Sequence, residues 1–402
     1  MSETLQCRKV FRFGMEPTET QQLQLERSAG VSRYIYNWAL ARCQSHYKTR
    51  GKSLPWGELS RELTQLKKAE HWLYDFDSQL MQQALANLKR AYGNFFEGRA
   101  GFPKFKKKKS ARQSFRIPQR VQIESGGCVY VPSMGSIRIR QSQPVELPTK
   151  SATFKRTGVG QWFVTLVAEF EIPAAKAPIR AERAIGFDAV LQPPNYLVGS
   201  DGSEVPAPRC YRAAQQRLRR ASRHFSRCKK ASHNHAKARI RLAKVHQDIT
   251  NLRHEFLHQL SHLAISTWDV VCFEDLSLRS LAKTKHAKSW LDASFGELLR
   301  QMEYKALWNS KHFVQVDQFF PSTKLCSECG YKNDDLGLSD RRWTCPACET
   351  QHIRDFNSAR NLKTEGLRIL AEGHLESLNA NGLDVRPDIV RAVGVEVRIP
   401  RL

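Results

Sequence analysis

The chain has 402 residues, of which 41% are hydrophobic and 26% are charged, a composition that excludes a disordered chain and predicts more than one globular domain. Its formal net charge of +25 predicts a polyanionic partner, either nucleic acid or an anionic membrane surface. No segment has the broad apolar face of a membrane-seeking helix, so the sequence favours nucleic acid. A basic structural protein that carries no chemistry is the alternative.

Targeting signals and cysteine usage indicate the compartment. The sequence has no run of 18 apolar residues and its N-terminal stretch lacks an apolar signal region, so we expect neither a membrane span nor secretion. Four of the ten cysteines form two close pairs, and the other six are scattered: Cys7, Cys43, Cys128, Cys210, Cys228 and Cys272. This pattern is typical of a reducing cytoplasm and one structural metal site.

The N-terminal part reads as one strand followed by helices. Residues 1–16 alternate between apolar and basic side chains, which predicts a strand. Residues 17–102 carry apolar residues at helical spacing, and Thr18 is a suitable helix N-cap. Most of these apolar residues are expected to be core, and a helical bundle without a direct function is the alternative.

A basic loop ends the helices. Pro103 forbids their continuation, and the following lysines are interleaved with phenylalanines; the lysines are Lys104, Lys106, Lys107, Lys108 and Lys109. Cations beside aromatic rings favour contact with a nucleic-acid backbone, although such runs are usually only solvated. Residues 120–172 then alternate around glycine turns, which predicts a small barrel or sheet that the N-terminal strand joins.

From about residue 183 the texture changes to α/β. Three short apolar strands are predicted in "AIGFDAV", "TWDVVCFEDL" and "HFVQVDQFF", and the first two end in acids, Asp188 and Glu274. Between them, residues 211–262 read as a helical hairpin. Residues 211–244 hold twelve Lys or Arg and no Asp or Glu, enough to neutralise several phosphates. The candidate contacts are Arg217, Arg219, Arg220, Arg223, Lys229 and Lys230, and a plain hairpin is the alternative.

Two cysteine pairs follow the third strand. Cys326, Cys329, Cys345 and Cys348 have the spacing C-x2-C-x15-C-x2-C. Four thiolates complete a closed tetrahedral zinc shell, which is structural rather than catalytic. An iron–sulfur cluster or a redox dithiol is the competing interpretation. The helical run after the finger begins with a third acid, Asp355, and the last stretch of the chain, 375–402, has no clear periodicity.

The three acids form a candidate magnesium site. Asp188, Glu274 and Asp355 stand at two strand ends and a helix start, positions that an α/β layer can bring to one sheet edge. Carboxylate oxygens are suitable ligands for Mg²⁺, and two such ions could activate water and stabilise the leaving oxygen of a phosphodiester. With 39 acids in the chain, this grouping is weak on composition alone.

Several motifs together resemble the TnpB family of transposon-encoded RNA-guided DNA nucleases, relatives of the compact type V CRISPR effectors. They include "SRYIYNWAL", "GFPKFKKKK", "FEDL", "GELLRQMEYKALW", "FFPSTKLCSECG" and "WTCPAC" followed by "HIRDFNSARNL", and they cover nearly the whole chain. The resemblance implies a multidomain α+β and α/β protein. Its parts would be a helical recognition domain, a small β-barrel wedge domain, and a RuvC-like, RNase H-type nuclease domain with an inserted zinc ribbon.

The resemblance also implies boundaries and partners. The wedge barrel would take residues 1–16 and 103–180, and the recognition domain 17–102. The nuclease domain would take 181–321 and 353–374, the target-nucleic-acid-binding zinc ribbon 322–352, and a flexible tail 375–402. The expected partners are a guide RNA from its own locus and double-stranded target DNA with a short flanking motif, bound by a monomer in the cytoplasm of a prokaryote.

Residue roles carried over from the family are specific. Asp188, Glu274 and Asp355 would be the catalytic, Mg²⁺-binding acids, with Arg354 and Asn357 supporting the last. Trp56 and Gln82 would face the flanking DNA, although both also fit as ordinary helix or core residues.

Two departures from the family pattern bear on activity. Asp188-Ala189-Val190 replaces the usual Asp-x-Gly, and Ile353 stands where the family has an acid. Since all three acids are present, we predict an active DNA endonuclease. An RNA-guided repressor without cleavage is the alternative, and a DNA-joining transposase is less favoured because no second nuclease motif or tyrosine-type motif is visible.

Overall fold

The computed structural model describes residues 4–372, except 109–112, 175, 191–193, 282, 284–286 and 338. The described residues form two compact units. The first unit contains Gln6–Glu171 and Lys229–Lys244; the second contains residues 4–5, Ile172–Cys228 and the described residues from Val245 onward. Lys109 and the tail 375–402, for which the sequence predicts a nucleic-acid contact and flexibility, lie outside the described residues.

The helices of the first unit begin and end where local sequence dictates. They are α1 (Glu19–Arg50), α2 (Trp56–Ala69), the 3-10 helix η1 (His71–Asp75) and α3 (Ser78–Phe96). Thr18 caps α1 as predicted, because its hydroxyl accepts from the Gln21 backbone N–H while the Gln21 side chain accepts from the Thr18 N–H. Gly51, with a φ of 65°, ends α1 in the left-handed conformation that glycine tolerates.

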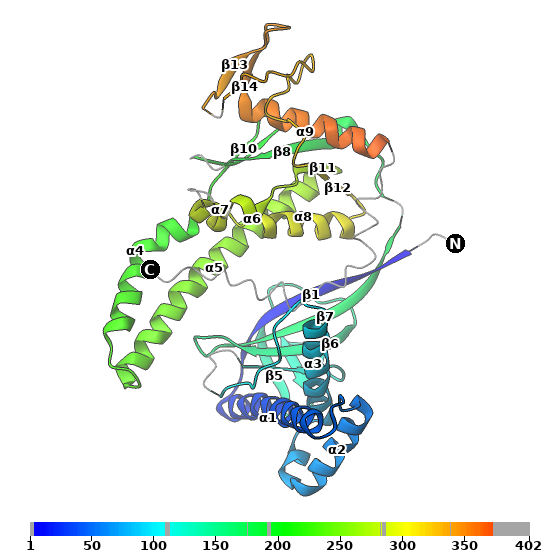
Figure 1. Ribbon diagram of the computed structural model, residues 1–402, viewed down its shortest axis with the longest axis vertical. Coiled ribbons are helices and arrows are strands. Elements are labelled where there is room, and N and C mark those ends of the chain that lie inside the picture. The colour runs from blue at the N-terminus through cyan, green and yellow to red at the C-terminus, as the bar shows by residue number, and fades with distance from the viewer. Residues whose placement is uncertain are drawn as a thin grey trace. The chain divides into compact units, whose positions relative to one another are not determined.

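A seven-stranded sheet completes the first unit (Figure 1). Its strands are β1 (Thr4–Glu16), β2 (Gln113–Ile117), β3 (Gln122–Glu124), β4 (Cys128–Val131), β5 (Gly135–Arg140), β6 (Thr149–Arg156) and β7 (Trp162–Pro173). The order is β2-β6-β7-β1-β5-β4-β3, so the N-terminal strand lies inside the sheet.

The predicted closed barrel is not found among the described strands. No hydrogen-bonded pair joins the two end strands, β2 and β3, so this sheet is open in the part of the chain that the structure describes. The physical reason lies in the core: buried residues of the helices, such as Leu40 and Leu88, belong to the same hydrophobic cluster as Phe11 and Phe154 of the sheet. The apolar face of the sheet is therefore buried against helices instead of being closed on itself.

The second unit is built on a mixed five-stranded sheet. Its strands are β8 (Ala184–Ala189), β9 (Asn195–Gly199), β10 (Glu204–Pro206), β11 (Val270–Glu274) and β12 (His312–Val316), in the order β10-β9-β8-β11-β12. β11 runs parallel to both β8 and β12, whereas β9 is antiparallel to β8 and β10 to β9. The three strands predicted from the sequence are β8, β11 and β12; β9 and β10 were not predicted.

Helices cover both faces of this sheet. The helices are α4 (Cys210–Arg227), α5 (His233–Thr267), α6 (Leu278–Leu281), α7 (Ala287–Ala293), α8 (Phe295–Trp308) and α9 (Arg354–Ala371), with the short 3-10 helix η2 (Ala181–Arg183) before β8. Phe187 and Phe273 belong to the hydrophobic cluster that α5 and α8 share, whereas Cys272 lies in the cluster that contacts Leu367 and Leu370 of α9. Figure 1 shows α9 on one side of the sheet and α8 on the other.

Two glycines let α9 approach the sheet closely. A Cβ on Gly186 of β8 would lie 2.2 Å from the carbonyl oxygen of Ala359 and 2.6 Å from the backbone nitrogen of Lys363. A Cβ on Gly366 of α9 would lie 2.2 Å from Sγ of Cys272 on β11. Only glycine fits at either contact, so the distance between α9 and the two strands that carry acids is fixed by the sequence.

The cysteine-containing finger, residues 322–353, joins β12 to α9. Its only strands in the described part are β13 (Arg342–Thr344) and β14 (Gln351–Ile353), which pair antiparallel. β14 ends at Ile353 and α9 begins at Arg354, so no linker separates the finger from the helix. None of the helices within the described residues is long and apolar enough to cross a membrane.

Candidate active site and cysteine finger

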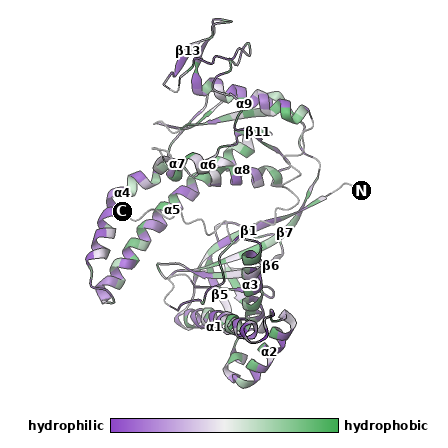
Figure 2. Cartoon of the chain, in the orientation of Figure 1, coloured by the Kyte–Doolittle hydropathy of each residue, from purple (hydrophilic) through white to green (hydrophobic). Residues whose placement is uncertain are grey.

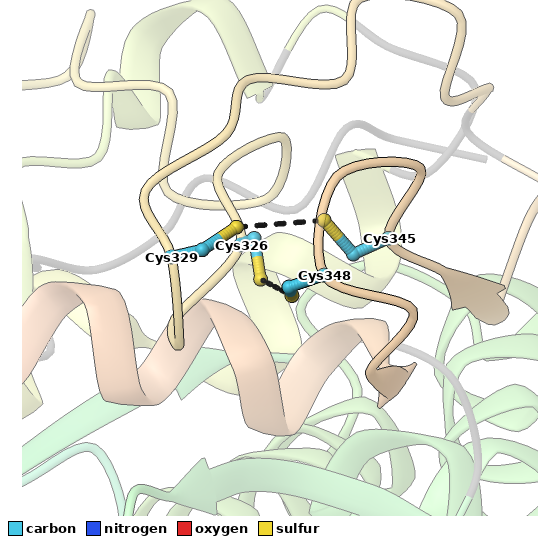
Figure 3. A group of neighbouring side chains, drawn as sticks. All are labelled: Cys326, Cys329, Cys345 and Cys348. Atoms are coloured by element: carbon cyan, nitrogen blue, oxygen red, sulfur yellow. Dashed lines mark hydrogen bonds between the residues drawn. The ribbon is translucent and has the colours of Figure 1, made fainter.

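Four cysteine sulfurs converge in the finger (Figure 3). Their Sγ atoms all lie within 4.8 Å of one another, and the Cys326–Cys348 and Cys329–Cys345 separations are both 3.6 Å. A zinc ion bound at about 2.3 Å by four sulfurs would place them about 3.8 Å apart, so this donor set fits zinc. Within the described residues no other group of His, Cys, Asp and Glu is gathered so closely.

The two cysteine knuckles have matching backbone turns. The N–H of Gly330 donates to the carbonyl of Cys326, and the N–H of Glu349 donates to that of Cys345, both at 2.9 Å. Gly330 and Glu349, which follow the second cysteine of each pair, have φ values of 74° and 57°. The sequence indicated this turn at the first knuckle through its glycine, but not at the second, where glutamate adopts the same left-handed conformation.

Strand register explains how two of the acids meet. Phe187 of β8 pairs with Phe273 of β11, so the next position on each strand places Asp188 beside Glu274. Side chains alternate along a strand, and both acids therefore share the face that Gly186 and Cys272 present to α9. Asp355, the second residue of α9, comes from the element packed on that face.

The acids interact electrostatically. Asp188 is buried, with an exposed fraction of 8%, and burial together with the charges of Asp355 and Glu274 raises its pKa to about 7. Burial also raises the pKa of Glu274, and Asp275 adds to this effect. Such an arrangement favours a bound cation, because a cation offsets the mutual repulsion of buried carboxylates. Their oxygens are not, however, all within 4.8 Å of one another in the described structure.

Two arginines accompany Asp355. Nη1 of Arg341 lies 3.1 Å from Oδ1 and 3.4 Å from Oδ2 of Asp355, and Nε of Arg354 lies 3.4 Å from Oδ1. Arg354 therefore lies where the family motif suggested. Arg341 was not predicted, because the contact spans fourteen residues and no periodic pattern marks it.

The other predicted supporting residue, Asn357, contacts the finger. Its Oδ1 accepts from the Ser327 N–H at 2.9 Å, and its Nδ2 donates to the Leu325 carbonyl at 2.6 Å. The hydroxyl of Ser358, which sequence reasoning missed, lies 3.2 Å from Oδ1 of Asp188. The succession of polar residues Asn357, Ser358 and Asn361 on an otherwise apolar helix face was the available signal.

The candidate nucleic-acid contacts lie largely on exposed surface. The basic loop is held on α1 by Asn37, whose amide bonds both the N–H and the carbonyl of Lys106, and Nζ of Lys106 lies 4.0 Å from the centre of the Tyr36 ring. The side chains of Lys104, Lys107 and Lys108 are exposed, as are those of the six candidates in the hairpin. Hydrophilic residues dominate α4 (Figure 2), and Arg217 pairs with Asp248 of α5 at 3.0 Å.

The two candidates for flanking-DNA contact differ in exposure. Trp56 is half-buried against the core of the first unit, with its ring centre 6.2 Å from that of Tyr92. Gln82 is exposed, and its Nε2 lies 3.5 Å from Oγ of Ser60. Trp56 thus has a packing role, whereas the Gln82 side chain faces solvent.

Three protein-family models match the chain. They are described as "Probable transposase" (residues 172–285), "Cas12f1-like, TNB domain" (residues 295–362) and "Helix-turn-helix domain" (residues 4–52). In the last of these stretches the structure has the strand β1 and the single helix α1.

Relatives match over nearly the whole length. A protein of Streptomyces pristinaespiralis named "Putative RNA-guided DNA endonuclease" is 35% identical over 375 residues, which cover 92% of each chain. "Putative RNA-guided DNA endonuclease InsQ" of Escherichia coli (strain K12) is 30% identical over 386 residues, 91% of this chain and 94% of that protein. "TnpB-like protein L79" of Acanthamoeba polyphaga mimivirus is 28% identical over 134 residues, 32% of this chain and 25% of that protein. The chain belongs to the TnpB family.

The fold of this TnpB chain also matches a solved structure. The Cas12f1 chain in "Cryo-EM structure of the Cas12f1-sgRNA-target DNA complex" is 13% identical, with a TM-score of 0.53 and coverage of 86% of this chain and 83% of that one. At this identity the likeness concerns the fold alone. It confirms a multidomain α+β architecture, and family membership confirms the resemblance drawn from the motifs.

Proposed function

We propose that this TnpB protein is an RNA-guided, Mg²⁺-dependent DNA endonuclease that cuts target DNA next to a short flanking motif. DNA endonuclease is the enzyme class in the names of the two relatives that match nearly the whole chain. The observation that carries the proposal is the convergence of Asp188, Glu274 and Asp355 from two parallel strands and the start of α9. A mixed sheet with this strand order, with acids at neighbouring strand ends, is what a RuvC-like, RNase H-type nuclease domain requires.

The roles of the side chains follow from their chemistry. The three carboxylates would hold Mg²⁺, which when bound supplies water activation and stabilisation of the leaving oxygen. Ser358 donates to Asp188 and so helps to hold this carboxylate in its ionised form. Arg341 and Arg354 reduce the negative charge around Asp355. The zinc-bound finger would present DNA beside Asp355, and the recognition and wedge parts would hold the guide RNA and flanking DNA through the basic loop, Gln82 and the α4–α5 hairpin.

The partners proposed are one guide RNA from the same locus and a double-stranded target, bound by a monomer. The guide would read sequence by base pairing, while the protein reads the shape of the heteroduplex and the flanking motif. The Cas12f1 chain of similar fold was solved in a complex with sgRNA and target DNA, which supports both kinds of partner here.

A nuclease-inactive, RNA-guided repressor is the second candidate. The departure at Val190 favours it, because the family glycine after the first acid is replaced by a buried β-branched residue. Both candidates bind the same partners, so only the chemical step separates them.

The deciding experiment is cleavage of a matched plasmid by the purified protein with its guide RNA and Mg²⁺. We expect linear product from the natural chain, and no cleavage with retained target binding from Asp188→Ala, Glu274→Ala and Asp355→Ala. A natural chain that binds the target tightly but nicks neither strand with Mg²⁺ or Mn²⁺ would contradict the endonuclease and leave the repressor. Metal analysis should give about one zinc per chain, lost in Cys345→Ser, and finding iron instead would contradict the zinc assignment.

A further inference from the structure

One face of α9 carries three buried polar side chains. Asn357, Ser358 and Asn361 stand at positions i, i+1 and i+4 of the helix, with exposed fractions of 1%, 0% and 7%. These positions share a helix face, and in an amphipathic helix a buried face is normally apolar. Burying three polar groups is unfavourable unless each is hydrogen-bonded, so their partners indicate what this face does.

Two of these side chains hold the entrance of the finger. Asn357 bonds the N–H of Ser327 and the carbonyl of Leu325. Nδ2 of Asn361 donates to the carbonyls of Ser322 and Leu325, both at 2.8 Å. Four hydrogen bonds therefore attach the segment that enters the first cysteine pair directly to α9.

The third side chain continues this contact to the catalytic site. Oγ of Ser358 lies 3.1 Å from Oγ of Ser322, which is 4% exposed, and 3.2 Å from Oδ1 of Asp188. An ionised carboxylate only accepts, so Ser358 donates to Asp188 and accepts from Ser322. Two hydroxyl groups thus connect the start of the finger with the first acid.

The other end of the finger is tied to the same helix. The N–H of Arg354 donates to the carbonyl of Arg341 at 2.9 Å, and the Arg341 side chain pairs with Asp355. Both ends of the finger are therefore fixed to the first two turns of α9, one next to Asp188 and one at Asp355.

We propose that Asn357 and Ser358 are positioning residues that couple the metal-loaded finger to the carboxylate site. Asn357 fixes the first cysteine knuckle on α9, and Ser358, oriented by Ser322, fixes the Asp188 carboxylate. The finger is then a structural part of the catalytic site in addition to any contact that it makes with DNA. The inference rests on the proposed function in one respect, namely that the acids bind a divalent ion.

The test measures Mn²⁺ affinity of the full-length, zinc-loaded protein by electron paramagnetic resonance of the free ion. The variants are Asn357→Ala and Ser358→Ala. Their matched controls are Asn333→Ala, whose side-chain oxygen accepts from the N–H of Asp335 within the finger, and Thr364→Ala, an exposed hydroxyl of α9. Zinc content and hydrogen exchange of the α9 amides are measured on the same samples.

We expect both test variants to keep one zinc per chain and to bind Mn²⁺ about tenfold or more weakly, which is the usual effect of removing a residue that orients a metal ligand. The controls should bind Mn²⁺ as the natural chain does. Asn357→Ala should also speed exchange of the amides in the first turn of α9, and Ser358→Thr should restore Mn²⁺ affinity.

Natural Mn²⁺ affinity in both test variants would overturn the proposal. Loss of zinc from Asn357→Ala would also overturn it, since Asn357 would then build the finger instead of linking it to the acids. The proposed function has its own arm: if Asp188→Ala binds Mn²⁺ as tightly as the natural chain, the acids are not the metal site, and the endonuclease proposal fails independently of Asn357 and Ser358.

Discussion

Replacing Asp188 by asparagine should stabilise the metal-free protein, and the gain should grow with pH. The acid has a pKa of 3.8 when exposed and about 7 in the folded protein, because burial and two neighbouring carboxylates oppose its ionisation. A group whose folded pKa is raised contributes stability that is fully present below the unfolded value and is lost as pH rises through the folded value. The natural chain therefore loses this contribution between about pH 4 and pH 7, while asparagine does not titrate.

The size of the effect follows from the two pKa values. Moving from 3.8 to about 7 corresponds to about 4 kcal/mol at most, since each pH unit is worth about 1.4 kcal/mol. Most of it develops between pH 5 and pH 8, where the difference between the natural chain and Asp188→Asn should widen by about 2–3 kcal/mol. The hydrogen bond from Ser358 can persist in the variant, because an amide oxygen also accepts.

Differential scanning calorimetry in Mg²⁺-free buffers at pH 5 and pH 8 measures this difference. The melting-temperature gap should widen by several degrees towards pH 8, at about 2–4 °C for each kcal/mol in a domain of this size. Adding Mg²⁺ at pH 8 should stabilise the natural chain more than the variant. A matched control is Asp335→Asn, an exposed carboxylate of the finger, whose gap should not change with pH. A gap that stays constant for Asp188→Asn would refute the reasoning.

Three further predictions test the packing and the surface. Gly186→Ala should destabilise the protein by about 1–3 kcal/mol or more and displace α9, as measured by calorimetry and hydrogen exchange, because its Cβ would lie 2.2 Å from the Ala359 carbonyl; Gly93→Ala in α3, with nothing within 4 Å, should be neutral or stabilising. Val190→Gly should lower stability by about 2–4 kcal/mol without faster plasmid cleavage, since Val190 is 7% exposed and its N–H already bonds the Tyr196 carbonyl; faster cleavage would show that the missing family glycine matters. Replacing Arg220 and Arg223 of α4 by glutamine should reduce the slope of log K against log salt for guide-RNA binding by about 0.7 for each phosphate that the helix no longer neutralises, and an unchanged slope would exclude this helix from the RNA site.

The sequence predicted those features that repeat at short range. Period-two alternation located β8, β11 and β12, and the side chain of Thr18 located the start of α1. The hairpin of β9 and β10 was missed because two prolines precede it, although Asp201-Gly202 between two apolar stretches is a typical hairpin turn and Gly202 has a φ of 84°. A closed barrel was predicted from alternation alone, which cannot tell a sheet covered by helices from one that closes on itself.

Interactions between distant parts of the chain were out of reach without the resemblance. Asp188 and Ser358 are 170 residues apart, and no local pattern pairs them. The two glycines that set the height of α9 over the sheet are also far along the chain from their partners and look like ordinary helix and strand irregularities in the sequence. Composition could therefore propose three acids among 39, whereas only packing shows why these three share one face.

The cost of Asp188 bears on the choice between cutter and repressor. A buried carboxylate that loses about 4 kcal/mol on ionisation is a large fraction of the stability of a typical domain. Asparagine would fill the same space, keep the hydrogen bond to Ser358 and remove the cost. A protein that only bound DNA would gain stability from that exchange and lose nothing in binding, since Asp188 faces α9 inside the second unit. Keeping an acid that is unfavourable without a cation is expected where stability is traded for function. The burial of Asp188 therefore favours a catalytic site that binds metal, and the finger attached to α9 favours one that depends on zinc for its geometry.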